Sequence, residues 1–125
     1  MWWRRKRAET LGQRGEALAA KLLKREGYRI LKRNAWLGRF EIDIIAREGD
    51  TIAFVEVRTR IETDSVPPEN TVGPTKRRRI IAAARRYIAE KGTPNAYYRF
   101  DVVGVIVPSA GKPRLTLYRN AFQPE

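Results

Sequence analysis

Apolar residues recur at helical spacing near the start of the chain. Residues 9–27 (ETLGQRGEALAAKLLKREG) carry apolar or small side chains every three or four positions, which predicts an amphipathic helix. Thr10 and Gln13 have the spacing of a capping box at its start. Gly27 is a typical residue for its end.

A second helix is predicted over residues 75–92 (TKRRRIIAAARRYIAEKG), with Thr75 as its N-cap and Gly92 at its end. Its apolar stripe consists of Ile80, Ile81, Ala84, Tyr87 and Ile88. The preceding segment, residues 61–75, contains three prolines and a glycine and predicts a long mobile loop.

Between and after the helices, β-branched and apolar residues predict strands. They cover residues 28–34, 39–48, 51–60, 97–108 and 114–119, with a loop at 35–38 and a turn at 48–50. The order α-β-β-β-α-β-β predicts one α/β domain over the 125 residues, preceded by a basic segment at 1–9.

The hairpin of residues 39–60 concentrates acidic side chains. If its turn consists of two residues at 48–49, Asp43 lies opposite Phe54 and Glu41 lies opposite Glu56. Because side chains alternate along a strand, any even-length turn puts Glu41, Asp43, Glu56 and Arg58 on one face. The opposite face would then be one apolar surface of Phe40, Ile42, Ile44, Ala53, Val55 and Val57.

Such a cluster of carboxylates needs compensation. Two carboxylates about 5 Å apart repel by roughly 3 kcal/mol at an effective dielectric near 20. Nearby arginines could supply the positive charge in a structural ion-pair network, and Arg39, Arg58 and Arg60 are close in sequence. A divalent cation such as Mg²⁺, which takes carboxylate and carbonyl oxygens, could supply it in a functional site. The spacing alone leaves both interpretations open.

Two further acids stand out by their surroundings. Glu16 follows Gly15 on the first helix, where small residues let the helix lie close to a sheet, although an ordinary exposed helix position explains Glu16 equally well. Asp101 lies among valines in RFDVV and needs a partner such as Arg99 or an arginine of the second helix.

The composition narrows the chemistry. The chain has no Cys and no His, which excludes disulfides, zinc fingers, thiol nucleophiles and His-based catalysis. Catalysis would then rest on carboxylates, Lys, Arg, Tyr or an oxygen-bound metal. A net charge of +12 indicates a polyanionic partner, with nucleic acid favoured over a membrane surface. Trp2 and Trp3 precede a basic run without an apolar core, so no signal peptide is predicted, and a cytoplasmic location is expected.

Several motifs together resemble a known family. GQRGEALAAKLL, GYRILKRN, EIDIIA, FVEVRTR and RFDVV look like the YraN-like family of predicted endonucleases. That family is related to archaeal Holliday-junction resolvases within the PD-(D/E)XK nuclease superfamily. The resemblance covers about residues 12–103 and implies a restriction-endonuclease-like fold, a mixed sheet with flanking helices.

The resemblance also implies site residues. Asp43 would be the central ligand of a Mg²⁺ or Mn²⁺ ion, Glu56 the acid of the Glu-x-Lys element, and the carbonyl of Val57 a further ligand. Glu16 would be the helix acid that reaches the metal or its water, and Glu41 matches the acid of the family's GEID stretch.

The sequence departs from the family pattern at two positions. Phe40 stands where the family usually has Gly before EID, and Arg58 replaces the Lys of Glu-x-Lys. In these nucleases the Lys is thought to orient the attacking water and balance the developing phosphate charge. Arg58 stays protonated, so it cannot act as a base, but it can stabilise an anionic transition state.

These observations favour a metal-dependent endonuclease-like protein that acts on DNA, with branched DNA and a homodimer suggested by the resolvase kinship. The alternative is a non-catalytic nucleic-acid-binding module that kept the fold, and Arg58 supports it. An acid–arginine network in a structural protein and binding to a membrane surface are weaker alternatives. The predicted nucleic-acid contacts are Lys76, Arg77, Arg78, Arg79 and Arg60, with Arg85, Arg86 and the N-terminal RRKR beside them.

Overall fold

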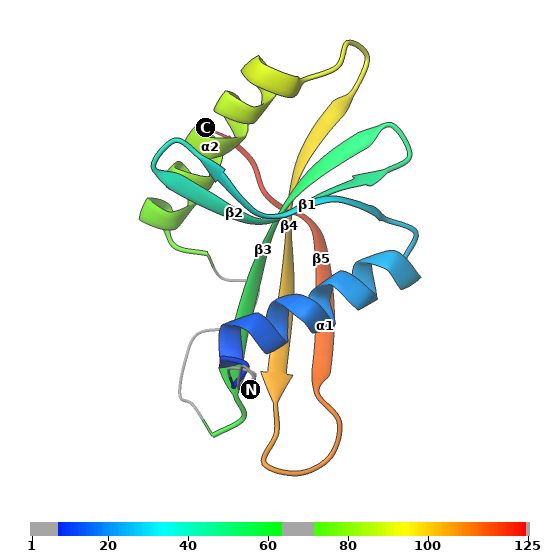
Figure 1. Cartoon of the computed structure of the whole chain (residues 1–125), viewed down its shortest axis with the longest axis vertical. Helices are drawn as coiled ribbons and strands as arrows, with labels where there is room; N and C mark the ends of the chain where they lie inside the picture. The colour runs from blue at the N-terminus through cyan, green and yellow to red at the C-terminus, as the bar shows by residue number, and fades with distance from the viewer. Residues whose placement is uncertain (1–7, 64–71, 125) are drawn as a thin grey trace, which may run out of the picture.

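The computed structural model describes residues 8–63 and 72–124. The described residues form two helices and five strands in the order α-β-β-β-α-β-β, as the sequence predicts (Figure 1). Their bounds are α1 Leu11–Arg25, β1 Arg29–Leu37, β2 Phe40–Glu48, β3 Thr51–Ile61, α2 Pro74–Lys91, β4 Tyr97–Val107 and β5 Arg114–Phe122. The basic run at residues 4–7, Trp2, Trp3 and the centre of the predicted loop lie outside the described residues.

The five strands form one mixed sheet in the order β1-β2-β3-β4-β5. Neighbouring strands are antiparallel except β3 and β4, which are parallel because α2 carries the chain back between them. The predicted α/β fold class, a mixed sheet with flanking helices, is therefore confirmed.

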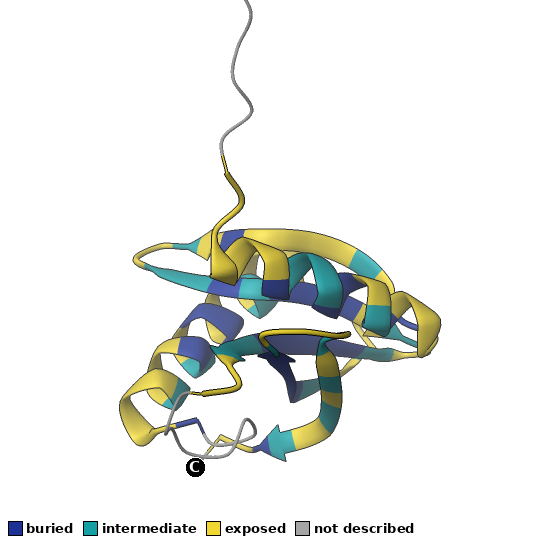
Figure 2. Cartoon of the chain, turned by 90° about the horizontal axis from the view of Figure 1, so that it is seen from below, coloured by how far each residue is buried: buried dark blue, intermediate teal, exposed yellow. Residues whose placement is uncertain are grey.

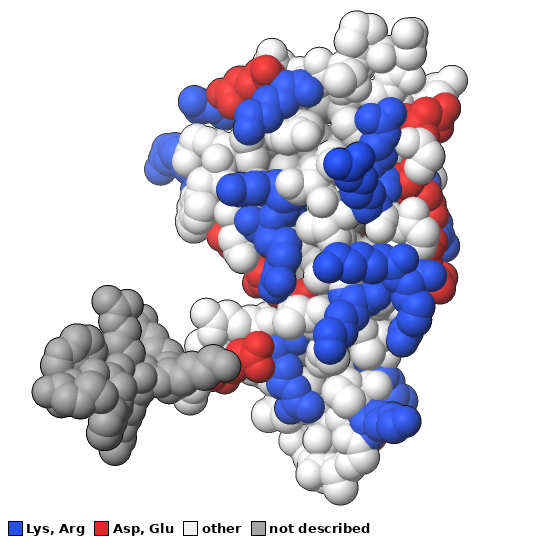
Figure 3. All heavy atoms as spheres, turned by 45° about the vertical axis from the view of Figure 1, so that its right-hand side comes forward, with Lys and Arg blue, Asp and Glu red and all other residues white. Residues whose placement is uncertain are grey.

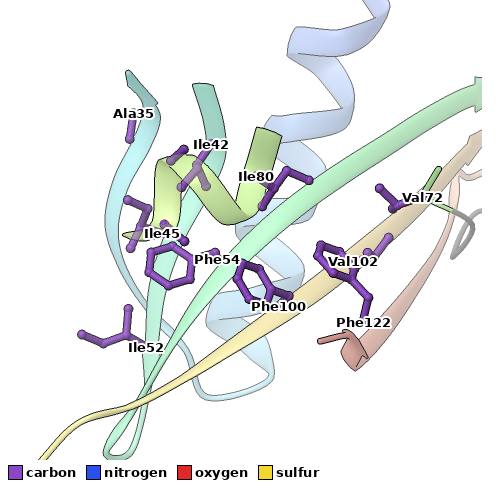
Figure 4. Packing of buried hydrophobic residues seen from close by; sticks show 12 residues of the cluster. Ala35, Ile42, Ile45, Ile52, Phe54, Val72, Ile80, Phe100, Val102 and Phe122 are labelled. Carbon is purple, nitrogen blue, oxygen red and sulfur yellow. The ribbon is translucent and has the colours of Figure 1, made fainter. Parts of the chain in front are cut away.

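Both faces of the sheet are buried. On one face α1 packs against strand residues such as Ile44, Val55 and Val103, and on the other α2 packs around Phe54 and Phe100. Figure 2 shows the two helices on opposite sides of the sheet, and Figure 4 shows the cluster on the α2 side. A sheet covered on both sides keeps only its edges and strand ends for polar side chains.

Ile42 and Ile44 correct the prediction of one apolar hairpin face. Ile42 lies in the cluster beside α2, whereas Ile44 lies in the cluster beside α1. Because residues two apart normally share a face, the alternation breaks between them. Phe40 also packs on the α2 side and Val57 on the α1 side, so the six predicted residues divide between the two faces.

The predicted hairpin turn is placed one residue too early, which shifts the predicted pairing by two residues. The turn consists of Gly49 and Asp50, so Glu48 pairs with Thr51 and Phe54 lies opposite Ile45 rather than Asp43. The turn is nevertheless of even length, as predicted. Gly49 has φ +61°, the left-handed conformation that two-residue hairpin turns require.

Two predicted element boundaries also differ. The predicted loop at residues 35–38 belongs largely to β1, because Ala35 and Trp36 pair with β2 residues up to a short turn at Gly38. The N-cap of α2 is Gly73 rather than Thr75, with Pro74 in the first turn, where its missing N–H costs nothing. The predicted loop 61–75 is therefore shorter at both ends.

Asp101 is fully buried and completely paired. Its carboxylate accepts hydrogen bonds from the Tyr28 hydroxyl at 2.7 Å, from the Arg99 guanidinium at 2.8 and 2.9 Å, and from the backbone N–H of Asn120 at 2.9 Å. Arg99 also pairs with Glu48, and these bonds connect β4 with β5, with the end of β2 and with the residue before β1. The predicted partner Arg99 is confirmed, and Asp101 is a structural acid.

The surface matches the positive net charge. Figure 3 shows Lys and Arg side chains spread over the face in view, with acidic side chains in smaller groups. Among the described helices, none is long and apolar enough to cross a membrane.

Gly15 sets the distance between α1 and the sheet. A Cβ atom on Gly15 would lie 1.8 Å from Oγ1 of Thr59 and 2.8 Å from its Cβ, so the helix rests directly on β3 at this point. We expect Gly15→Ala to destabilise the protein by about 2 kcal/mol, because helix or strand must shift. Denaturant unfolding measures this change.

Gly12, one turn earlier on the same helix, is the matched control. A Cβ atom there meets nothing within 4 Å, so Gly12→Ala should stabilise the protein by about 0.5 to 1 kcal/mol through helix propensity. Equal stability of the two alanine variants would contradict the close helix–sheet contact.

Candidate functional site

A pair of carboxyl groups lies where β2 and β3 part. The regular β2–β3 pairing runs from Glu48–Thr51 to Ile44–Val55. Beyond it, the backbone N–H of Val57 donates to Oδ2 of Asp43 at 2.8 Å. The Asp43 side chain thus takes a hydrogen bond from the β3 backbone just past the end of the regular pairing.

The carboxyl groups of Asp43 and Glu56 interact with each other. Glu56 is only 8% exposed, and Asp43 is partly buried. Burial and the neighbouring Glu56 raise the pKa of Asp43 to about 8. A carboxyl group this near another acid is stabilised by a proton or by a cation.

Lys76 supplies the positive charge nearest to this pair. Its Nζ lies 3.4 Å from Oε2 of Glu56, and its side chain is half exposed. It lies in the first turn of α2, on the opposite side of the sheet from α1. The arginines suggested as compensation, Arg39 and Arg58, form no hydrogen bond or ion pair with the site acids among the described residues.

The first helix adds Glu16. The Asn34 amide donates to Oε1 of Glu16 at 2.6 Å, and the close contact at Gly15 brings this turn of α1 against β3. Burial and then the neighbouring Asp43 raise the pKa of Glu16, while the Asn34 hydrogen bond lowers it. The charges of Glu16 and Asp43 therefore act on each other.

Glu41 completes the acidic group. Burial, then Asp43 and then Glu16 raise its pKa, while Lys76 and a hydrogen bond from Asn34 lower it. The structure thus gathers all four predicted acids, Glu16, Glu41, Asp43 and Glu56. Their catalytic and metal-binding roles remain predictions, as does that of the Val57 carbonyl.

Asn34 is a site residue that sequence reasoning missed. It interacts with both Glu16 and Glu41, and its φ of +51° is a left-handed conformation within β1. Asn tolerates this conformation better than most residues. The signal available in the sequence was an Asn at the end of a β-branched and basic run, which was interpreted only as the end of a strand.

The basic residues at the start of α2 point in different directions. Arg77 donates to the carbonyl of Val72 at 2.5 Å and lies over the Phe122 ring at 5.3 Å. Arg79 lies over the Phe40 ring at 5.9 Å, and Arg78 donates to the Thr75 hydroxyl. Of the predicted nucleic-acid contacts on α2, Lys76 is the one that pairs with a site acid.

A cavity of about 450 Å³ lies between α2 and the segment after β5. Arg77, Arg78 and Arg85 line it, together with Pro74, Ile81, Ala82 and Gln123. This lining combines guanidinium groups with apolar surface and contains no acidic side chain. Arg60, the remaining predicted contact, lies on β3 and is partly buried.

Carboxyl oxygens are the donors that hard divalent cations prefer. No three acidic side chains among the described residues are already arranged as a closed metal cage. Mg²⁺, however, keeps several waters and commonly binds through one or two carboxylates. Asp43 and Glu56 provide two interacting carboxyl groups, and a cation bound between them would displace the proton that the raised pKa of Asp43 favours.

At high pH and without a bound cation, the ionised Asp43 beside Glu56 should lower the free energy of unfolding. The folded pKa of Asp43, about 8, is raised above the unfolded value of 3.8, so the stability that its protonation contributes is fully present below about pH 4 and is lost as pH rises through about 8. The substitution Asp43→Asn preserves the shape of the side chain and removes its negative charge. At pH 9 and without divalent ions, we expect the variant to be about 2 kcal/mol more stable than wild type.

This difference should shrink as the pH falls from 9 to 5, and thermal unfolding across that range measures it. Asp50→Asn is the control, because Asp50 is an exposed acid on the β2–β3 turn. If both variants shift stability equally at every pH, the raised pKa of Asp43 is refuted.

Comparison with solved structures finds Pyrococcus furiosus SfsA in complex with Ca²⁺, at 15% identity and a TM-score of 0.42. The match covers 86% of this chain and 61% of that one, so this chain spans about three fifths of its length.

Sequence relatives are much closer. A UPF0102 protein of Anaeromyxobacter sp. (strain Fw109-5) is 45% identical over 91% of this chain and 85% of its own length. A UPF0102 protein of Chlorobium phaeobacteroides is 42% identical over 92% and 94%, and one of Geobacter sulfurreducens is 42% identical over 90% and 88%. The model of the Uncharacterised protein family UPF0102 matches residues 15–105, which include the four acids and Lys76. The chain therefore belongs to the UPF0102 family.

Proposed function

We propose that this protein is a metal-dependent endonuclease that hydrolyses DNA phosphodiesters. The observation that carries the proposal is the interaction between the carboxyl groups of Asp43 and Glu56 beside Lys76. At Asp101 the carboxylate is matched by a cation, Arg99, and by further hydrogen-bond donors. At the site, Lys76 pairs with Glu56, but no cation pairs with Asp43 among the described residues, and a divalent cation would relieve the remaining repulsion.

The roles of the residues follow from their positions. Asp43 and Glu56 would hold Mg²⁺ or Mn²⁺, with the Val57 carbonyl as a further ligand. When bound, the ion would lower the pKa of a water molecule and neutralise phosphate charge. Glu16, held by Asn34, would orient that water through a hydrogen bond, and Glu41 would add negative charge at the rim of the site.

The basic surface supports nucleic acid as the substrate. The start of α2 carries Lys76, Arg77, Arg78 and Arg79 in succession, although cations there oppose the helix dipole by some tenths of a kcal/mol each. A phosphate backbone lying along α2 would offset that cost. DNA, branched substrates and a two-fold symmetric dimer follow from the resemblance to Holliday-junction resolvases.

A second candidate function is nucleic-acid binding without cleavage. The observation that favours it is Arg58, which stands at the position of the superfamily lysine and cannot lose its proton. In this case the carboxyl pair would remain protonated and the protein would only hold its ligand.

Metal titration separates the two functions. In calorimetry, we expect Mn²⁺ and then Mg²⁺ to bind wild-type protein at one saturable site that Asp43→Asn abolishes, because the variant removes a charged ligand. Incubated with Mn²⁺, wild type should cut linear or four-way-junction DNA, and Asp43→Asn should be at least 100-fold slower.

Asp50→Asn, with an exposed acid changed in the same way, should bind Mn²⁺ and cut DNA as wild type does. Tight DNA binding with neither metal heat nor cleavage would replace the endonuclease with the binding module.

Salt dependence tests where DNA lies. If about six cations contact phosphates, log K should fall against log salt with a slope near −5. The double variant Arg78→Gln/Arg85→Gln, in the cavity beside α2, should reduce this slope by about two units in fluorescence anisotropy.

Arg47→Gln/Lys112→Gln removes the same charge from the end of β2 and from the β4–β5 turn as a control. An equal loss of slope in both double variants would show diffuse attraction rather than a path along α2.

A further inference from the structure

We infer that Lys76, and not Arg58, is the cation that contacts the reacting phosphate, and the inference rests on the endonuclease proposed above. Arg58 occupies the position of the superfamily lysine in sequence. In the structure, the charged group beside the acids comes from α2 instead.

Lys76 is directed at the site acids. Its Nζ lies 3.4 Å from Oε2 of Glu56. Its charge also reaches Asp43 and Glu41, where it offsets part of the effect of burial on their pKa values. An ammonium group has three donors, and its side chain is 49% exposed, so a second donor can reach a phosphate oxygen without releasing Glu56.

The first turn of α2 is held firmly on both sides of Lys76. Val72, just before the helix, is buried at 1% exposure in the cluster around Phe54. Arg77, just after Lys76, binds the Val72 carbonyl and lies over the Phe122 ring. A cation placed by packed neighbours loses less freedom when it meets the transition state, which is what electrostatic catalysis requires.

Arg58 has a different environment. It lies two residues after Glu56 on β3, partly buried, and no described residue forms a hydrogen bond or ion pair with its guanidinium. A planar guanidinium suits two-point binding of a phosphate, so Arg58 fits a non-scissile phosphate of the substrate.

The chemical step is a hydrolysis. A water oxygen forms a bond to phosphorus, the bond from phosphorus to the leaving oxygen breaks, one water proton passes to solvent, and the leaving oxygen takes a proton from solvent. Lys76 stays protonated throughout and lowers the energy of the negative charge that gathers on the phosphate oxygens.

The test compares Lys76→Gln, Lys76→Arg and Arg58→Gln, with Lys91→Gln at the far end of α2 as the charge control. At saturating DNA and Mn²⁺, we expect Lys76→Gln to cut at least 100-fold more slowly, with DNA affinity within about threefold of wild type. Lys76→Arg should recover part of the loss. Arg58→Gln should weaken DNA binding and keep the rate at saturation within about tenfold.

A second readout does not depend on cleavage. Because Lys76 would repel a cation held by Glu56, Lys76→Gln should bind Mn²⁺ about threefold to tenfold more tightly in calorimetry, whereas Arg58→Gln and Lys91→Gln should match wild type. Circular dichroism and thermal unfolding establish that each variant is folded.

The outcomes separate the inference from the proposed function. If wild type cuts DNA, and Arg58→Gln abolishes the rate at saturation while Lys76→Gln keeps it, the inference is overturned and the endonuclease stands. If wild type cuts no DNA with Mn²⁺ or Mg²⁺, the proposed function fails and the inference fails with it.

Discussion

The interaction between the carboxyl groups of Asp43 and Glu56 is the constraint on which the rest of the site depends. Burying two acids side by side opposes folding, so the surrounding structure must hold them together. The backbone N–H of Val57 fixes Asp43, the β3–β4 pairing carries Glu56, and Lys76 balances one charge. The regular pairing of β2 with β3 begins only at Ile44, so the part of β2 that carries Asp43 leaves its side chain free to reach the Val57 backbone.

The two helices approach this opening from opposite faces of the sheet. On one face, the absence of a side chain at Gly15 lets α1 rest on Thr59, which brings Glu16 and its partner Asn34 toward Asp43. On the other, buried Val72 and the contacts of Arg77 fix the start of α2, which brings Lys76 to Glu56. The acids and their cation thus come from separate elements, and the core positions both.

Periodicity was enough to predict the helices, the strands and their order, because a 3.6-residue or two-residue pattern is written locally in the sequence. It also gave the even length of the β2–β3 turn. It could not place the turn at Gly49–Asp50 rather than one residue earlier, since both registers keep the same residues on each face. It could not foresee that Ile42 and Ile44 face different clusters, because a strand pattern assumes unbroken alternation. The positions of Asn34 and Lys76 in the site depend on such long-range packing. Periodicity therefore could not predict them.

Two aspartates face inward among the residues that the structure describes, and their difference supports the functional interpretation. Asp101 is entirely buried and receives hydrogen bonds from Tyr28, Arg99 and the Asn120 backbone, so its charge is satisfied within the fold. Asp43 is less buried, receives one backbone hydrogen bond and otherwise faces another acid. With 26 Lys and Arg residues available in the chain, a fold that needed only stability could have paired Asp43 as it paired Asp101. Because Asp43 lies beside another acid, Glu56, the pair can still bind positive charge. A divalent cation with a phosphate bound to it would supply that charge.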